Sequence, residues 1–82
     1  MPKQAALPPT LPPRLIGRDA AAAYINVSPN TFDKMIEAGR MPRPRILADR
    51  RQAWDVRELD SAVDSLPHRG DSEPVDADEG WT

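Results

Sequence analysis

The placement of proline constrains this chain more than any other feature of its sequence. Ten of the 82 residues are proline, and five of them fall within residues 1–13. Proline lacks a backbone N–H and its ring clashes inside a helix, so it is confined to helix starts, turns and extended segments. The folded domain is therefore expected over residues 14–66, where Pro29 suits the first position of a helix and Pro42 and Pro44 exclude one.

The two ends of the chain differ from this middle part. Residues 1–13 carry almost no charge and are predicted to form a Pro-rich flexible arm. Residues 67–82 are rich in Pro, Gly, Asp and Glu and are predicted to form a disordered acidic tail. Trp81 in this tail is either incidental or a tip that docks on a partner or on the protein's own basic surface.

The composition argues against several classes of function. The chain has no cysteine, and its only histidine, His68, lies at the start of the polar tail. A zinc site or a histidine-based catalytic site is therefore not expected, and we predict a protein that is not an enzyme and needs no cofactor or metal. No apolar run approaches the ~20 residues of a membrane span, and the N-terminus lacks the apolar core of a signal peptide. The expected location is the cytoplasm, without a membrane partner.

The charge is unevenly distributed along the chain. The net charge is −2, yet residues 14–57 contain nine Lys and Arg against five Asp and Glu, whereas residues 58–82 contain one Arg against eight acids. A basic body with an acidic end is typical of proteins that bind nucleic acid, although it is a weak indication alone.

Two short helices are predicted in the first half of the domain. The first covers about residues 18–25, where an alanine run favours helix and leaves a thin face for a neighbour. The second begins at Ser28, a good N-cap, and ends near Gly39, which suits a left-handed C-terminal position. Phe32 lies on its apolar face. The short connection around Asn26, a residue that tolerates positive φ, predicts a helix-turn-helix.

A hairpin and a third helix are predicted in the second half. Two β-compatible runs flank a tip near Asp49 and Arg50, which predicts a two-stranded hairpin of uncertain register. Asp55 then caps a helix over residues 55–66, with Glu58 in the position of a capping box. The buried stripe of this helix is expected to contain Val56, Leu59, Val63 and Leu66. A helix-turn-helix followed by a hairpin and a helix is a winged-helix arrangement, so the expected fold class is mainly α with a small β-hairpin.

These motifs resemble a known family. The segment LIGRDAAAAYINVSPNTFDKMIEAGRMPRPRIL, followed by AWDVRELDSAV, is similar to the excisionase-type and AlpA-type helix-turn-helix proteins, whose fold is related to the DNA-binding part of MerR regulators. These are small winged-helix DNA binders of phages and integrated elements. The resemblance covers about residues 14–66. It departs from the family at Asn30 and Asp33, where Arg or an aromatic residue is common.

The second helix is the expected recognition helix, which would enter the major groove of double-stranded DNA. Asn30 would pair with adenine, Asp33 would accept from the N4 amine of cytosine, and Lys34 would contact phosphate or guanine. Ser28 and Thr31 would either hold a phosphate or serve only as the helix cap. Asp33 is alternatively a solvated surface acid.

The hairpin is the expected wing. Five arginines fall within residues 40–51 with only Asp49 among them, whereas an ordinary solvated surface would mix charges of both signs. A basic wing tip suits a narrow minor groove, where the negative potential is enhanced. Arg18 is expected to contact the DNA backbone. The arginines expected on DNA from the wing and its flank are Arg40, Arg43, Arg45, Arg50 and Arg51.

The sequence leaves three functions open. The resemblance favours an excisionase, a recombination directionality factor that binds cooperatively with further copies of itself near an attachment site, bends DNA and acts with a cognate integrase. The expected fold equally supports an AlpA-like regulator that binds a promoter. A protein–protein module, such as an antitoxin or adaptor, is the alternative from another class.

Overall fold

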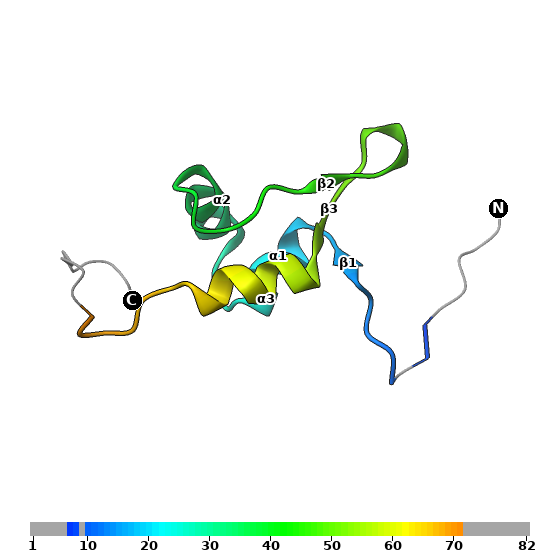
Figure 1. Ribbon diagram of the computed structural model, residues 1–82. Helices are drawn as coiled ribbons and strands as arrows, with labels where there is room; N and C mark the ends of the chain where they lie inside the picture. The colour runs from blue at the N-terminus through cyan, green and yellow to red at the C-terminus, as the bar shows by residue number, and fades with distance from the viewer. Residues whose placement is uncertain (1–6, 9, 72–82) are drawn as a thin grey trace.

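The computed structural model describes residues 7, 8 and 10–71 of the chain. In this part, three α-helices combine with a three-stranded antiparallel sheet (Figure 1). The elements follow one another as β1 (Leu15–Ile16), α1 (Arg18–Tyr24), α2 (Pro29–Glu37), β2 (Arg45–Ile46), a short 3-10 segment η1 (Ala48–Arg50), β3 (Gln52–Asp55) and α3 (Val56–Asp64). The order expected from the sequence is confirmed, with one added strand.

Helix α1 ends in a left-handed turn that aims the chain into α2. Its alanines Ala21 and Ala22 are fully buried, which lets neighbouring elements approach closely. Asn26 has a φ of 65°, and the N–H groups of Asn26 and Val27 donate to the carbonyls of Ala23 and Ala22, both at 3.0 Å. This 5→2 and 6→1 pairing is a Schellman motif, so the left-handed role expected of Asn26 is confirmed.

Helix α2 begins and ends at the residues that its sequence predicts. The Ser28 hydroxyl accepts from the backbone N–H of Thr31 at 3.2 Å, and Pro29 occupies the first helical position. At the other end, Gly39 has a φ of 79°, and the N–H of Arg40 donates to the Met35 carbonyl at 2.8 Å. Local hydrogen bonds thus cap the helix at both ends and fix which residues belong to it.

The sheet has one strand more than predicted. Strand β3 is central and pairs antiparallel with β2 through Ile46 opposite Gln52, and with β1 through Ile16 opposite Trp54. The two residues of β1 are too few to show a period-two pattern, so only their partner in space reveals them as strand. The expected two-stranded hairpin is therefore part of a three-stranded sheet.

Helix α3 has the predicted cap but a slightly different buried stripe. The Asp55 carboxylate accepts from the Arg57 backbone N–H at 2.9 Å. Leu59 is fully buried and Leu66 packs against the core, but Val63 is 40 % exposed and Ala62 takes its place. Positions 59, 62 and 66 share one helical face, so the inclusion of Val63 in the stripe was wrong.

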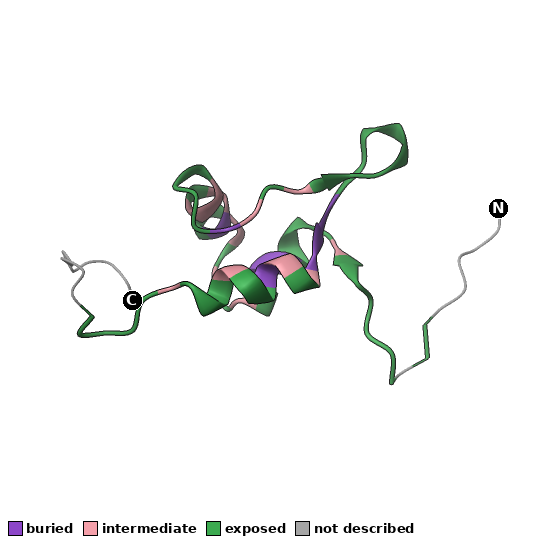
Figure 2. Cartoon of the chain, in the orientation of Figure 1, coloured by how far each residue is buried: buried purple, intermediate pink, exposed green. Residues whose placement is uncertain are grey.

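The core joins the helices to the hairpin through aromatic residues. The rings of Phe32 and Trp54 meet edge to face with centroids 5.3 Å apart, and both belong to the same core cluster as the buried Leu59. Figure 2 colours most of β3 and part of α3 as buried. The Trp54 indole N–H donates to the Pro42 carbonyl at 3.0 Å, so this side chain also holds the segment between α2 and β2. Trp54 therefore connects the hairpin both to α3 and to α2.

The predicted arm and tail lie mostly outside the described residues. Of the arm, residues 7, 8 and 10–13 are described, and both Leu7 and Leu11 are exposed. Residues 72–82, with Trp81, lie outside. No helix among the described residues is long and apolar enough to cross a membrane.

Candidate nucleic-acid interface

The outer face of α2 is polar. Phe32 points into the core, and Met35 and Ile36 pack against it, so the opposite face carries the exposed Asn30, Thr31 and Lys34. Asn30 has no side-chain hydrogen bond among the described residues. Its amide is therefore available to pair with a ligand in the way that the amide of asparagine pairs with adenine.

Ser28 and Thr31 are engaged in the helix cap. The Ser28 hydroxyl donates to Thr31 Oγ1 at 3.0 Å while it accepts from the Thr31 backbone N–H. Both side chains are exposed. The Thr31 hydroxyl proton remains available to an external acceptor. The structure thus gives both residues a structural role and leaves a contact to phosphate as a second one.

Asp33 and Arg18 form an ion pair between α2 and α1. Arg18 Nε donates to Asp33 Oδ1 at 3.0 Å and Nη2 donates to Oδ2 at 2.7 Å. This two-bond contact lowers the pKa of the Asp33 carboxyl, mainly through the hydrogen bond from Arg18, and keeps it ionised. The acid that was expected to accept from cytosine therefore already has both oxygens occupied by one arginine.

The base of the hairpin holds two further ion pairs. Arg14 Nε and Nη2 donate to the two Asp55 oxygens at 3.2 and 2.9 Å, and Arg45 pairs with Glu58. The hydrogen bond from Arg14 lowers the pKa of Asp55, whose side chain is 4 % exposed. Arg45 was expected on DNA, but the structure ties it to α3. The Glu58 carboxylate binds Arg45, whereas a capping box would have it bind the backbone N–H of Asp55.

The remaining predicted cations have no acidic partner within residues 10–71. They follow the chain from α2 through the segment 38–44 to the hairpin tip, which lies along the upper side of the molecule in Figure 1. We call them the free cations. They are Lys34, Arg40, Arg43, Arg50 and Arg51. All are exposed, so they offer N–H donors to an anion without removing an internal salt bridge.

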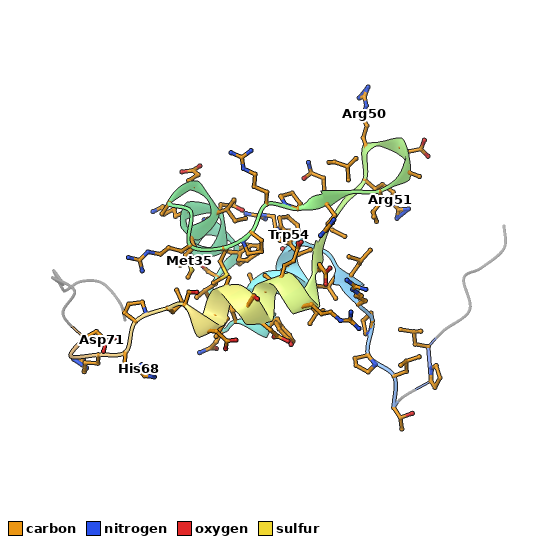
Figure 3. All side chains as sticks on the ribbon, in the orientation of Figure 1. Met35, Arg50, Arg51, Trp54, His68 and Asp71 are labelled. Carbon is orange, nitrogen blue, oxygen red and sulfur yellow. The ribbon has the colours of Figure 1, made fainter. Side chains whose placement is uncertain are left out.

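The hairpin tip has an unusual backbone. Asp49 and Arg50 have φ values of 56° and 64°, although neither is glycine. The turn is closed by hydrogen bonds from the Arg51 N–H to the Ala48 carbonyl at 3.1 Å and from the Leu47 N–H to the Arg51 carbonyl at 2.6 Å. A left-handed residue with a side chain costs about 1–2 kcal/mol. Figure 3 shows the Arg50 side chain extending outward from the tip and the Arg51 side chain leaving the tip in a different direction.

The side chains on this surface suit an anionic ligand. Residues 10–71 contain no group of three or more His, Cys, Asp and Glu placed to hold a metal ion. The free cations and the Asn30 amide offer hydrogen-bond donors, and Asn30 adds one acceptor. A polyanion with hydrogen-bonding edges, rather than a small apolar molecule, matches this set.

The sequence did not predict which arginine pairs with which acid. The partners of Asp33 and Asp55 lie 15 and 41 residues earlier in the chain. No periodicity joins positions that far apart. No family model, no curated protein and no solved structure matches the chain.

Proposed function

We propose that this protein is a double-stranded DNA-binding accessory protein of a phage or mobile element, built as a small winged helix-turn-helix. In this proposal, α1 and α2 form the helix-turn-helix, α2 enters the major groove, and the β2–β3 hairpin is the wing. The chain performs no chemistry itself. Its role is to bind and bend DNA near an attachment site, as an excisionase does together with an integrase.

One observation carries the proposal. The structure uses Arg14, Arg18 and Arg45 in ion pairs, yet leaves the five free cations without an acid on consecutive segments that run from α2 to the hairpin tip. Exposed cations close to one another repel, and without an acidic partner they add little to the stability of a fold. Their retention along one side of the molecule is explained by a polyanionic partner.

The strained tip adds support for a wing. Backbone strain persists where the surrounding structure and a function require it. Here it holds Arg50 at the outermost point of the hairpin (Figure 3). A guanidinium in that place suits a narrow minor groove, provided that α2 occupies the adjacent major groove.

The salt dependence of binding tests this proposal. If each free cation contacts one phosphate, the slope of log K against log salt is up to about −4.5 per bound copy. Fluorescence anisotropy with a random duplex between 50 and 300 mM salt measures this slope directly. Screening of exposed charges increases across this range of salt. A protein–protein module instead predicts weak binding of random duplex at every salt concentration, and that result would reject the proposal.

A footprint separates the two DNA-binding roles. The purified protein is tested on the attachment region of its own element and on the promoter upstream of the integrase gene. Protection of several adjacent repeats at the attachment region supports the excisionase role. Protection restricted to the promoter supports an AlpA-like transcriptional regulator.

A further inference from the structure

We infer that Arg18, held in place by Asp33, recognises a guanine within one or two base pairs of the one that Asn30 contacts. This rests on the proposed DNA binding and goes beyond it, because it names a base and the two residues that select it. Arg18 thereby becomes a specificity residue instead of a backbone contact, and Asp33 becomes its positioning residue instead of a cytosine acceptor.

The donors of Arg18 explain the choice of guanine. A guanidinium has five N–H donors, which form a side-on pair and an end-on pair. Asp33 takes the side-on pair, Nε and Nη2. The end-on pair, Nη1 and Nη2, keeps free hydrogens, because the nearest other acid, Asp19, lies 3.8 Å from Nη1 and forms no hydrogen bond with it. Two parallel donors match the O6 and N7 acceptors of guanine.

The position of the pair on α2 places it among the expected base contacts. Asp33 lies three residues after Asn30, so the two side chains are neighbours on the helix surface, about 5–6 Å apart at Cβ. The Arg18 side chain is 43 % exposed, so the pair lies at the surface and not in the core. Neighbouring base pairs are about 3.4 Å apart along the duplex. The guanine is therefore expected within one or two base pairs of the adenine that Asn30 contacts.

The ion pair is better suited to orientation than to stability. Both side chains are more than two-fifths exposed, and exposed pairs contribute little because solvent screens them. A two-bond contact nevertheless fixes the plane of the guanidinium before DNA arrives. This lowers the entropy cost of forming two further hydrogen bonds to one base.

The test begins with selection of preferred duplexes from a randomised library by the wild-type protein. Affinity is then measured for all four bases at each selected position with wild type, Arg18→Ala, Arg18→Lys and Asp33→Asn, with Arg57→Ala as the charge-matched control on α3. We expect Arg18→Ala to lose a guanine preference of roughly 5- to 150-fold at one position only. Arg18→Lys keeps the charge but lacks the planar fork, so it should keep the affinity for random duplex and reduce the guanine preference. Asp33→Asn should also reduce that preference in part.

A modified base provides a second measurement, in which the main effect is read on the wild-type protein. Replacing the selected guanine by 7-deazaguanine removes the N7 acceptor. It should weaken wild-type binding several-fold and leave Arg18→Ala unchanged.

Four results would overturn the inference. Equal weakening on all sequences, rescued by Arg18→Lys, would make Arg18 a phosphate contact. A lower Tm with unchanged base preference in both Arg18→Ala and Asp33→Asn would make the pair a tie between helices. If the wild-type protein selects no sequence at all, the proposed sequence-specific function fails, and the inference fails with it. If it selects a sequence that ignores Arg18, only the inference fails.

Discussion

The two ends of the β2–β3 hairpin use the same residue type in opposite ways. At the base, Arg14 and Arg45 are each paired with an acid of β3 or α3, and Trp54 is buried. At the tip, Arg50 and Arg51 are exposed, have no acid partner among residues 10–71, and sit on a strained turn. The arginines at the base connect elements of the fold, whereas those at the tip form no ion pair within the described residues and remain accessible to solvent. Arginines counted alike in a charge sum thus have distinct roles.

The largest expected effect is at the base. Trp54→Ala removes the ring that contacts Phe32 and the N–H that binds Pro42, and such core truncations cost about 3–5 kcal/mol. That approaches the entire stability of a small domain. Thermal denaturation followed by circular dichroism should show no cooperative transition. A variant that melts within a few degrees of wild type would show that the base does not support the fold.

The next effect is at the tip and concerns binding. Arg50→Ala combined with Arg51→Ala should weaken DNA binding by roughly 10- to 100-fold near 100 mM salt and reduce the salt slope by up to about 1.8. The Tm should change by no more than about 2 °C, because neither side chain has an internal partner among the described residues. Arg57→Ala combined with Arg69→Ala removes the same charge elsewhere and serves as the control. Equal loss in both double variants would contradict a special role for the tip.

Low pH should destabilise the protein through Asp55, at the base of the hairpin. The pKa of Asp55 is lowered in the folded state by the hydrogen bond from Arg14, relative to an ordinary value of 3.8. A lowered folded pKa contributes stability that is present above about pH 4 and lost as the pH falls through the folded pKa. The Asp55 contribution to the wild-type urea midpoint should therefore change little between pH 7 and 4 and fall between pH 4 and 3. Asp55→Asn should have a lower urea midpoint at pH 7 and should depend less on pH. An unchanged acid dependence would place the responsible carboxylate elsewhere.

The smallest effect separates strain from charge at the tip. Arg50→Gly relieves a positive φ and should raise the Tm by roughly 4–8 °C, the shift that about 1 kcal/mol produces in a domain of this size. Arg51→Gly removes the same charge at a φ of −73°, so it should not stabilise the protein. Both should weaken DNA binding. If the two variants melt alike, the tip turn is not strained.

Much of the fold was predictable because its signals are local. Ser28, Asp55, Asn26 and Gly39 act on backbone groups within a few residues, so their roles could be assigned from sequence and are confirmed. The alanine run and the apolar face around Phe32 likewise placed two helices. The positive φ at Arg50 had no such signal, because arginine does not favour that conformation.

By itself the sequence determined where the helices and the hairpin begin and end, since caps, prolines and apolar spacing act over one or two turns of chain. Only the tertiary structure decided that Leu15 and Ile16 form a strand against β3, and which arginines are paired. Those outcomes depend on groups 13 to 41 residues apart meeting in space. A carboxylate accepts from the guanidinium that the packing of the helices brings within reach, and the arginines left over form the surface available to a partner.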